Sequence, residues 1–319
     1  MVKRSNTEVR KLDDAARAGW MYYVAGKTQE EIANKLNISR QSAQRLVALA
    51  VSAGLIKVRL EHPIAKCMDL KEKIKKRFGL EFCRVVPSDD EDPSSTIGLA
   101  QAGASVIEQH LRSKEPKVVA VGTGRVLKSC VDELASLNCE QHQIVAMLGN
   151  MASDGSASSY DVVMRMAEHV NAKHYPMPLP VLPSSKKEKD QLHAQPYIAS
   201  NLKLAARADA TFVGVGNLGL NSPLHIDGFI TKPELDELQE KGAVGELIGW
   251  VFDKNGKLLD CAVNKRVASA PLIENPDKYV CAIAAGEEKV YAILGAARSK
   301  LINGLITNEY TAERLLSID

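Results

Sequence analysis

The sequence is poor in aromatic residues, which make up 5% of its 319 positions, and it lacks the patterns that mark several protein classes. No stretch approaches the roughly 20 consecutive apolar residues that a membrane helix needs. Residues 1–14 carry no apolar core of a secretory signal. The six cysteines form no CxxC pair and have no histidines at zinc spacing, so we expect reduced thiols in the protein core. These absences predict a soluble, cytoplasmic chain with no membrane partner, no metal and no cofactor.

The charge of the chain is small overall but unevenly distributed. The net charge is +2, yet residues 1–60 hold eleven Lys and Arg against five Asp and Glu, which leaves 30 basic and 34 acidic residues in positions 61–319. A basic head on a mildly acidic body indicates an anionic partner for the head, with nucleic acid as the first candidate. With 45% hydrophobic residues, the chain can bury large cores and is long enough for two or three domains.

Residues 1–62 are predicted to form a helix-turn-helix domain. Apolar positions at helical spacing predict a helix over residues 9–25, which Gly26 ends. Thr28 and Glu31 form a capping-box pattern at the start of a second helix, Gln29–Leu36. The turn 37–39 follows, with Asn37 at a position that tolerates left-handed backbone, and Ser39 can cap a third helix from residue 40 to about residue 53. A helix, a three-residue turn and a second helix is the helix-turn-helix layout.

The third helix is predicted to carry the contacts to double-stranded DNA. Arg and Gln side chains suit guanine and adenine edges, and Ser suits phosphate. Recognition helices present such residues near their N-terminus. An ordinary three-helix cluster with solvated polar faces is the alternative. The predicted DNA-binding residues lie at the starts of the second and third helices: Thr28, Gln29, Ser39, Arg40, Gln41, Ser42, Gln44 and Arg45.

Two segments behind the head leave alternatives open. Leu55–Leu60 alternates like a strand and predicts a wing whose Lys57 and Arg59 contact phosphates, or else a solvated hairpin. Residues 63–80 form a linker in which a helix over 66–78 carries one apolar stripe. That helix either pairs with its twin in a dimer or docks on the body. The stripe consists of Cys67, Leu70, Ile74 and Phe78.

Residues 81–319 are predicted to form an α/β domain. Strands and helices alternate, which favours a largely parallel, doubly wound sheet with helices on both faces. The predicted strands are Phe82–Val86, Val118–Val121, Gln143–Met147, His174–Pro176, Ala210–Val215, Glu246–Phe252, Tyr279–Ala284 and Gly304–Thr307. The predicted helices are Pro93–Leu111, Arg125–Leu137, Ser159–Val170, Pro196–Arg207, Lys232–Lys241 and Glu288–Lys300.

Several predicted strands run into glycines, and ligands bind at the carboxyl ends of strands in such sheets. In "VVAVGTGR" (118–125) the backbone amides of Gly122, Thr123 and Gly124 can hold phosphate oxygens at a helix N-terminus, and Arg125 adds a guanidinium. Lys289 brings a second cation from the last glycine turn. A phosphate group is the expected occupant. A dinucleotide is less suitable, because Leu127 stands where the third glycine of that fingerprint belongs.

The chain resembles the SorC family, the sugar-binding transcriptional regulators of bacteria. The similarity covers nearly the whole chain and lies in "WMYYVAGKTQEEIANKLNISRQSAQRLVALAVSAGLIKV", "AVGTGRVL", "FVGVGNLG", "GAVGELIGWVFDKNGK" and "AAGEEKVYAILGAARSKLINGLITNEYTAERLL". It implies a winged helix-turn-helix joined to an effector domain that resembles sugar-phosphate isomerase and deaminase folds. It also implies a homo-oligomer, a dimer or more usually a tetramer, and a phosphorylated sugar or polyol as effector of a carbohydrate or polyol operon.

The resemblance also assigns roles to matching positions. Loop 122–125 and Lys289 would hold the phosphate, and Glu246 would accept hydrogen bonds from sugar hydroxyls. Four further residues would line the cleft: Gly149, Asn150, Gly216 and Asn217. The sequence departs from the family pattern at two positions, which affects the expected identity of the effector rather than the existence of the pocket. Ala285 replaces the first glycine of the family's usual pair, and Val126 stands where a hydroxyl residue is often found.

The alternative function is an enzyme, a sugar-phosphate isomerase or deaminase with an accessory DNA-binding head. Such an enzyme needs an acid or base poised for proton transfer. The candidates are Asp154, Asp161, His225, Asp227 and Glu246, but the acid cluster of pentose-phosphate isomerases is absent. The sequence therefore favours a regulator without catalytic residues.

Overall fold

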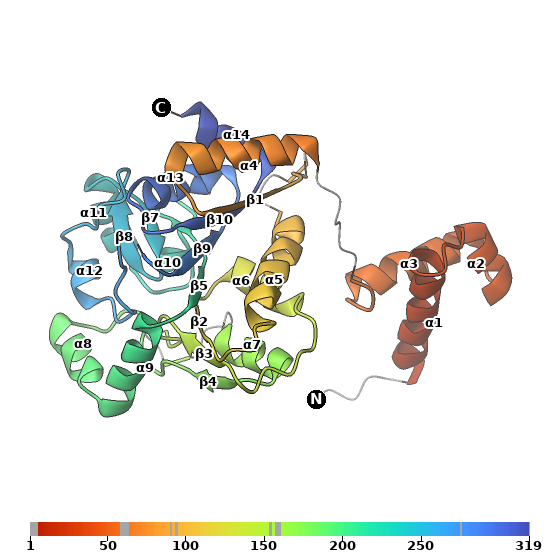
Figure 1. Ribbon diagram of the computed structural model, residues 1–319, viewed down its shortest axis with the longest axis horizontal. Helices are drawn as coiled ribbons and strands as arrows, with labels where there is room; N and C mark the ends of the chain where they lie inside the picture. Colours follow the sequence, from red (N-terminus) through yellow and green to blue (C-terminus); the bar gives the residue numbers. More distant parts are fainter. Residues whose placement is uncertain are drawn as a thin grey trace. The chain divides into compact units, whose positions relative to one another are not determined.

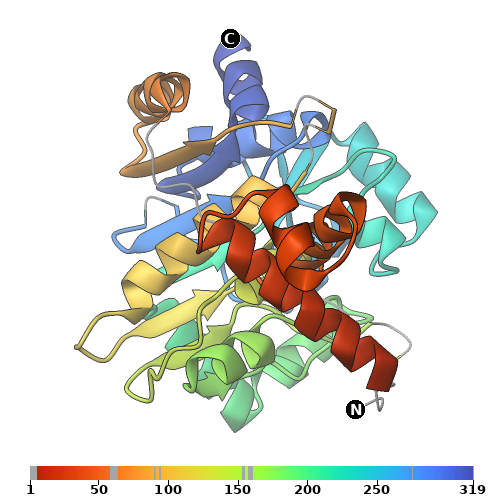
Figure 2. The same ribbon diagram turned by 90° about the vertical axis from the view of Figure 1, so that its right-hand side faces the viewer.

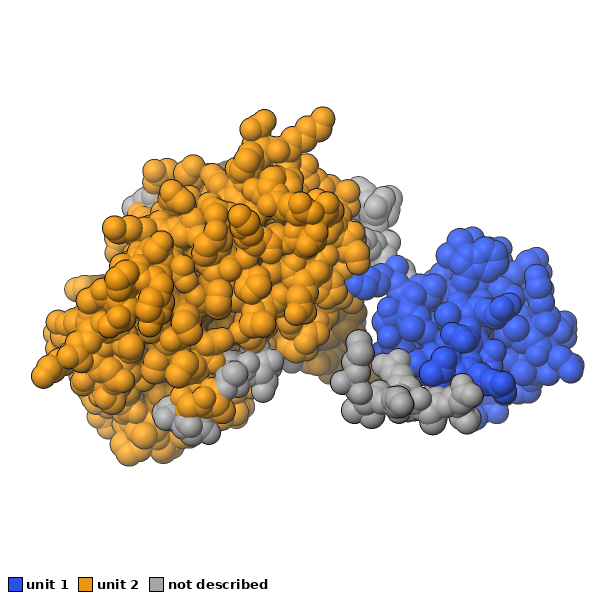
Figure 3. All heavy atoms as spheres, turned by 90° about the horizontal axis from the view of Figure 1, so that it is seen from below, with its two compact units in different colours: residues 1–62 blue, residues 63–319 orange. Residues whose placement is uncertain are grey.

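The computed structural model describes residues 6–57, 64–89, 91–92, 95–152, 155–156, 161–274 and 276–318. The chain divides into two compact units, residues 1–62 and residues 63–319, which are coloured separately in Figure 3. We refer to them as the head and the body. Among the described residues, no helix is both long enough and apolar enough to cross a membrane.

The described residues of the head form three helices. The starts of the second and third follow the predicted caps, whereas the first covers residues 6–23 rather than 9–25. The three helices are α1 (Asn6–Tyr23), α2 (Gln29–Leu36) and α3 (Arg40–Ser52), drawn in red and orange in Figures 1 and 2. The capping box is confirmed: the amide of Glu31 donates to the Thr28 hydroxyl, and the amide of Thr28 donates to the Glu31 carboxylate at 2.8 Å. Asn37 adopts the left-handed conformation, and Ser39 caps α3.

A small apolar core holds the three helices of the head together. Ala33 is buried at the crossing of α2 with its neighbours, as the helix-turn-helix pattern requires, and Ile32, Ala43 and Val47 pack with it. The predicted strand Leu55–Leu60 lies half outside the described residues, since positions 58–63 are not described, and residues 55–57 form no strand. The predicted wing therefore stays a prediction.

The body is built on a parallel sheet of seven strands. Their order is β1-β10-β9-β5-β2-β3-β4, and every neighbouring pair is parallel. The strands are β1 (Phe82–Val86), β2 (Val118–Val121), β3 (Gln143–Ala146), β4 (Lys173–Tyr175), β5 (Ala210–Val213), β9 (Tyr279–Ile283) and β10 (Gly304–Asn308). Figure 1 shows the sheet running through the body between layers of helices. The predicted parallel sheet is confirmed.

Two apolar cores lie on the two faces of this sheet. Successive strand residues alternate between them: Val119 and Cys281 belong to one core, Ala120 and Ala282 to the other. The first core takes the buried faces of α5 (Ile97–Leu111), α6 (Arg125–Asp132) and α7 (Val163–Val170). The second takes those of α4 (Ala65–Phe78), α13 (Val290–Arg298) and α14 (Glu309–Ser317). Helix α9 (Pro196–Ala206) packs on β2 and β3.

The strand order reverses between β2 and β5. From β2 the chain moves outward through β3 to β4, and from β5 it moves the other way through β9 to β10. The loops behind β2 and β5 therefore leave the sheet in opposite directions. Such a reversal opens a crevice at the carboxyl ends of the strands, which is where sheets of this kind bind ligands.

A second sheet was not predicted. The predicted single strand Glu246–Phe252 is wrong: β7 (Ala243–Leu247) and β8 (Trp250–Asp253) form an antiparallel hairpin, and β6 (Gly216–Asn217) pairs with β7. The chain reverses at Ile248 and Gly249, whose φ angles are +46° and +87°. Positive φ at both central residues is the geometry of a two-residue hairpin turn.

Several helix bounds also differ from those predicted. Helix α6 ends at Asp132 rather than Leu137, and the predicted helix Glu288–Lys300 begins as a short 3₁₀ turn, η1 (Glu287–Lys289), followed by α13. The N-terminal residues of the predicted helices from Pro93 and Ser159 lie outside the described residues, and α5 and α7 begin at 97 and 163. Helices α8 (Lys186–His193), α10 (Pro223–Ile226), α12 (Ala262–Arg266) and α14 were not predicted. The predicted helix Lys232–Lys241 is confirmed as α11 (Lys232–Glu240).

The linker helix α4 docks on the body, which decides between the two alternatives for it. Its predicted apolar stripe is buried and belongs to the core that also holds α13 and α14. Arg77 donates to the carbonyl of Leu316 at 2.7 Å, and Lys66 forms an ion pair with Glu313 at 2.8 Å. Both contacts join α4 to α14, so the helix is packed against its own chain.

Candidate ligand-binding site

A pocket lies at the reversal of the strand order, at the carboxyl ends of β2 and β5. Its cavity volume is about 110 Å³. The turn behind β2, the turn behind β5, the β7–β8 hairpin, the α10 region and η1 all contribute to its wall. The lining residues are Thr123, Gly124, Arg125, Val126, Leu148, Val181, Gly214, Val215, Gly216, Pro223, Leu224, Asp227, Phe229, Glu246, Ile248, Gly249 and Lys289.

The first glycine turn of the pocket forms because β2 ends against the start of α6. Gly124 is the N-cap of α6, and its φ of +118° is a conformation that favours glycine. The amide of Gly122 donates to the carbonyl of Phe212 on β5 at 2.8 Å, which fixes the turn to the neighbouring strand. Thr123, Gly124 and Arg125 line the pocket at the positive end of the α6 dipole. This end of the pocket suits an anion.

Lys289 lines the same pocket from the other side of the strand reversal. It follows a second glycine turn, in which Gly286 has a φ of +114° and donates its amide to Thr311 at 2.9 Å. Burial lowers the pKa of Lys289, whereas the nearby Glu246 carboxylate acts to raise it. Within the described part of the chain, no hydrogen bond and no ion pair within 4 Å is found for its ammonium group.

Glu246 extends from β7 into the pocket. Its carboxylate accepts the amide of Gly249 at 2.7 Å, and Gly216 lies so close that an added Cβ would be 2.0 Å from Oε1. Burial raises the pKa of the Glu246 carboxyl, against the effects of the Gly249 amide and of Lys289. Ile248, beside it, is a β-branched residue at positive φ, a strained conformation of the kind that persists at functional sites.

A second, smaller hollow of about 20 Å³ adjoins the pocket and shares Thr123 and Leu148 with it. Gly122, Gly149 and Asn150 line this hollow. The amide of Asn150 donates to Asp161 at 2.8 Å, and a Cβ on Gly149 would lie 2.2 Å from the carbonyl oxygen of Leu179.

The predicted effector residues are therefore brought together with one exception. Thr123, Gly124, Arg125, Gly216, Glu246 and Lys289 line the pocket, and Gly122, Gly149 and Asn150 line the adjoining hollow. Asn217 lies outside both linings. It is buried, its side-chain oxygen accepts the amide of Gly219 at 3.0 Å, and its amide faces Glu288. Its contacts shape the loop after β6.

Sequence reasoning missed the apolar wall of the pocket. Leu148, Val181, Leu224, Phe229 and Ile248 line it, and in the sequence they look like ordinary core residues. Asp227 was named from the sequence only as a candidate catalytic acid or base. In the structure its carboxylate accepts a hydrogen bond from Arg125 at 2.9 Å.

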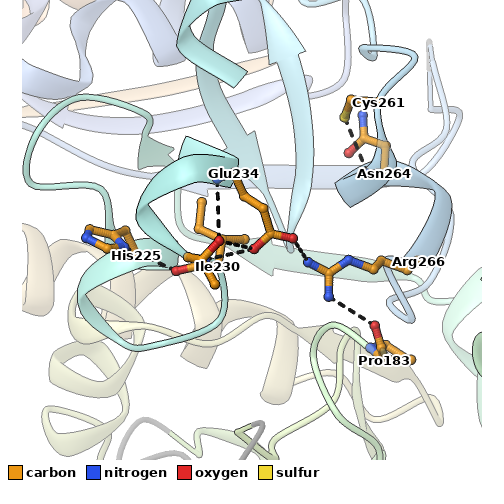
Figure 4. Close-up of polar contacts among 8 residues, drawn as sticks. Pro183, His225, Ile230, Glu234, Cys261, Asn264 and Arg266 are labelled. Carbon is orange, nitrogen blue, oxygen red and sulfur yellow. Dashed lines mark hydrogen bonds and ion pairs between the residues drawn. The ribbon is translucent and has the colours of Figure 1, made fainter. Parts of the chain in front are cut away.

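The residues considered for an enzyme do not form an acid–base pair around a substrate. Asp154 lies outside the described residues, and Asp161 is bonded to Asn150. Nδ1 of His225 lies 3.1 Å from the carbonyl oxygen of Ile230, as Figure 4 shows, and His225 is not part of the pocket lining. Asp227 is paired with Arg125, and Glu246 is the other acidic residue of the pocket lining.

The head presents most of its predicted DNA-binding residues on its surface. Thr28, Ser39, Arg40, Gln41, Gln44 and Arg45 are exposed, and Gln29 and Ser42 are half-buried. The hydroxyls of Thr28 and Ser39 cap α2 and α3, so both residues have a structural role in the helix starts. The guanidinium of Arg40 lies 3.9 Å from Glu30.

Comparisons with known proteins assign the body and the whole chain to one class. The family model described as "Putative sugar-binding domain" matches residues 62–317. The erythritol catabolism regulatory protein EryD of Brucella abortus is 32% identical over 303 residues, covering 95% of this chain and 96% of its own. The sorbitol operon regulator of Klebsiella pneumoniae is 25% identical over 303 residues, covering 93% and 95%.

Solved structures share the fold. The full-length sorbitol operon regulator SorC from Klebsiella pneumoniae superposes with a TM-score of 0.70 at 24% identity, covering 96% of this chain and 99% of its own. A DeoR family transcriptional regulator from Listeria monocytogenes reaches a TM-score of 0.72 at 23% identity, covering 78% and 99%.

A sugar-binding α/β body behind a three-helix head defines a class of transcriptional regulators. Within that class, the chain belongs to the SorC family of sugar-binding transcriptional regulators. The predicted family is confirmed. The prediction of a regulator rather than an enzyme is also confirmed, because these relatives are named as regulators.

Proposed function

We propose that this regulator controls a carbohydrate or polyol catabolic operon and that a phosphorylated sugar-type effector sets its affinity for operator DNA. The observation that carries the proposal is one pocket lined both by the first glycine turn and by Lys289, which lie far apart in the sequence. The effector binds there, with its phosphate between the amides of residues 122–125, Arg125 and Lys289. Two cations and a helix N-terminus favour a dianion.

The polar groups on the opposite side of the pocket suit the hydroxyls of a sugar or polyol. Glu246 accepts hydrogen bonds, and the absence of a side chain on Gly216 lets its carboxylate lie against the backbone. Asn150, in the adjoining hollow, offers an amide at the same rim. Relatives named for erythritol and sorbitol make polyol phosphates the first ligands to test.

The head binds double-stranded operator DNA through the exposed start of α3, with Arg40, Gln41, Gln44 and Arg45 at base edges and phosphates. The body, which resembles doubly wound sugar-phosphate isomerase and deaminase folds, assembles the chain into a dimer or tetramer in the cytoplasm and so sets the spacing between heads. The spacing between heads has two arrangements that differ in operator affinity. The effector changes operator affinity only because it binds one of these arrangements more tightly than the other.

A thermal-shift screen tests the effector. We expect sugar and polyol phosphates, beginning with erythritol 4-phosphate, to raise the unfolding temperature of the full chain, whereas the unphosphorylated compounds do not. A gel shift with the DNA upstream of the protein's own gene then tests whether the active compound changes operator binding. Turnover of any sugar phosphate by the purified protein would contradict the proposal in favour of an enzyme.

A further inference from the structure

The α10 segment, residues 218–230, forms one wall of the pocket and is held to the body at both ends and in its middle. Pro223, Leu224, Asp227 and Phe229 line the pocket from this segment. Toward its N-terminal end, Asn221 donates to Glu288 at 2.9 Å, next to Lys289. In its middle, Asp227 accepts a hydrogen bond from Arg125, across the pocket on α6.

The C-terminal end of the segment is anchored to the body by a separate set of contacts. Figure 4 shows Glu234 beside the backbone that follows Ile230, with Arg266 on its other side. The amide of Thr231 donates to Glu234 at 2.8 Å, Glu234 forms an ion pair with Arg266, and Arg266 donates to the carbonyl of Pro183 at 3.1 Å. These contacts are separate from the one between Asp227 and Arg125, so that contact can break while the end of the segment stays fixed.

Asp227 and a ligand anion would compete for Arg125, because two negative groups at one guanidinium repel each other. Its side chain is 50% exposed, whereas that of Asp227 is 21% exposed, so a ligand entering the pocket reaches the guanidinium more readily than the carboxylate. A phosphate near neutral pH carries close to two negative charges and a carboxylate carries one. A charge-assisted, bidentate contact to phosphate would therefore be stronger than the Asp227 contact, whereas a carboxylate ligand would compete with Asp227 on equal terms.

We propose that Asp227 is a positioning and specificity-determining residue: it holds Arg125 while the pocket is empty, and a phosphate dianion displaces it and thereby releases the middle of the α10 segment from α6. The inference rests on the proposed function and names the residue that would make the site select phosphates over sugar acids. Gly228, with a φ of +76°, follows Asp227 directly and gives the chain a flexible position at the point of release.

The test uses hydrogen exchange of amides 219–230 and titration with inorganic phosphate, both on the full chain. Asp227→Asn should speed exchange of this segment without ligand. It should also tighten phosphate binding about 1.5- to 5-fold, which corresponds to the free energy of an exposed ion pair. Asp236→Asn is the matched control: it removes the same charge from the Lys232–Asp236 pair on α11 and should change neither quantity. Unchanged exchange, or weaker phosphate binding, in Asp227→Asn overturns the inference.

Arg125→Ala completes the experiment as a double-mutant cycle. Alone it should speed exchange of the α10 segment as much as Asp227→Asn does, and the double variant should add nothing. Additive effects would show that the two residues act separately and would overturn the inference. If exchange follows this pattern but neither phosphate nor any polyol phosphate binds, the proposed effector is wrong and the selectivity for phosphate fails with it, while the link between Arg125 and the α10 segment stands.

Discussion

At the scale of the residue, the polar groups of the pocket could be predicted and its apolar groups could not. The turn 122–125 and Lys289 were predicted because several strands end in glycine turns, whose backbone amides can hold an anion, and a cation follows the last of these turns. Phe229 and Ile248 were missed because an apolar side chain in a pocket wall has the same sequence pattern as one in the core. Asn217 was placed in the cleft by resemblance, yet its bonds go to Gly219 and Glu288.

Glu246 gives a prediction for the pH dependence of stability. Its pKa in the folded chain is raised above the ordinary value near 4.5, so the folded state binds this proton more tightly than the unfolded state does. The free energy of unfolding should therefore fall as pH rises from about 4.5 through the raised pKa. Glu246→Gln should remove the contribution of Glu246 to this decrease in the free energy of unfolding, as measured by urea unfolding at a series of pH values. The exposed Glu240→Gln is the control, and an identical pH dependence in all three proteins would contradict the prediction.

At the scale of the element, caps and periodicity predicted the helix starts of the head well and turns poorly. The start of α2 at Gln29 and of α3 at Arg40 followed from Thr28 and Ser39, whose hydroxyls can accept local amides. The β7–β8 hairpin was missed because its turn is Ile248-Gly249, whereas Asn-Gly or Asp-Gly is the usual signal for positive φ at both positions. Burial of the Ile248 side chain offsets the strain of its positive φ. This burial depends on tertiary packing, which a local sequence pattern does not reveal.

The packing of β7 on α13 sets the separation of Glu246 and Lys289, and Gly245 controls it. A Cβ on Gly245 would lie 2.3 Å from the Cβ of Ala292 on α13. Gly245→Ala should therefore push the two elements apart, destabilise the body by about 1–3 kcal/mol, and weaken effector binding. Thermal unfolding and effector titration measure both effects.

Gly98→Ala is the control for Gly245→Ala. Its Cβ would meet the Val86 side chain at 3.3 Å and the Pro87 carbonyl oxygen at 3.8 Å, inside a helix that favours alanine. We expect its stability to stay within about 1 kcal/mol of the wild type. Equal stability and equal effector binding in Gly245→Ala and the wild type would show that β7 and α13 can separate without cost.

At the scale of the whole molecule, the sequence predicted two kinds of domain but not the order of the strands. Parallel strands pair over long sequence separations: β1 pairs with β10, more than 200 residues away. Only the pairing places the reversal between β2 and β5, and hence brings Arg125 and Lys289 to one pocket. The separate roles of head and body can be predicted from the sequence alone, because residues 1–60 are basic and the rest of the chain is mildly acidic.

This division predicts that DNA binding and effector binding can be separated by mutation. Arg45→Ala removes an exposed cation at the start of α3, so it should weaken operator binding about tenfold or more and reduce its salt dependence. The effector-induced rise in unfolding temperature should stay the same, because the pocket lies in the other unit. Lys254→Ala, an exposed cation on the body, is the control. Loss of both responses in Arg45→Ala would indicate a folding defect and contradict the separation.

The central claim is that an anionic metabolite bound between the 122–125 turn and Lys289 controls operator affinity. The most direct measurement is the affinity for operator DNA, by fluorescence anisotropy, with and without saturating effector, for the wild type and for Lys289→Ala. The account predicts that the wild type changes its affinity about 5- to 150-fold, while Lys289→Ala binds DNA like the effector-free wild type and does not respond. A Lys289→Ala variant that responds to the phosphorylated effector as the wild type does would contradict it.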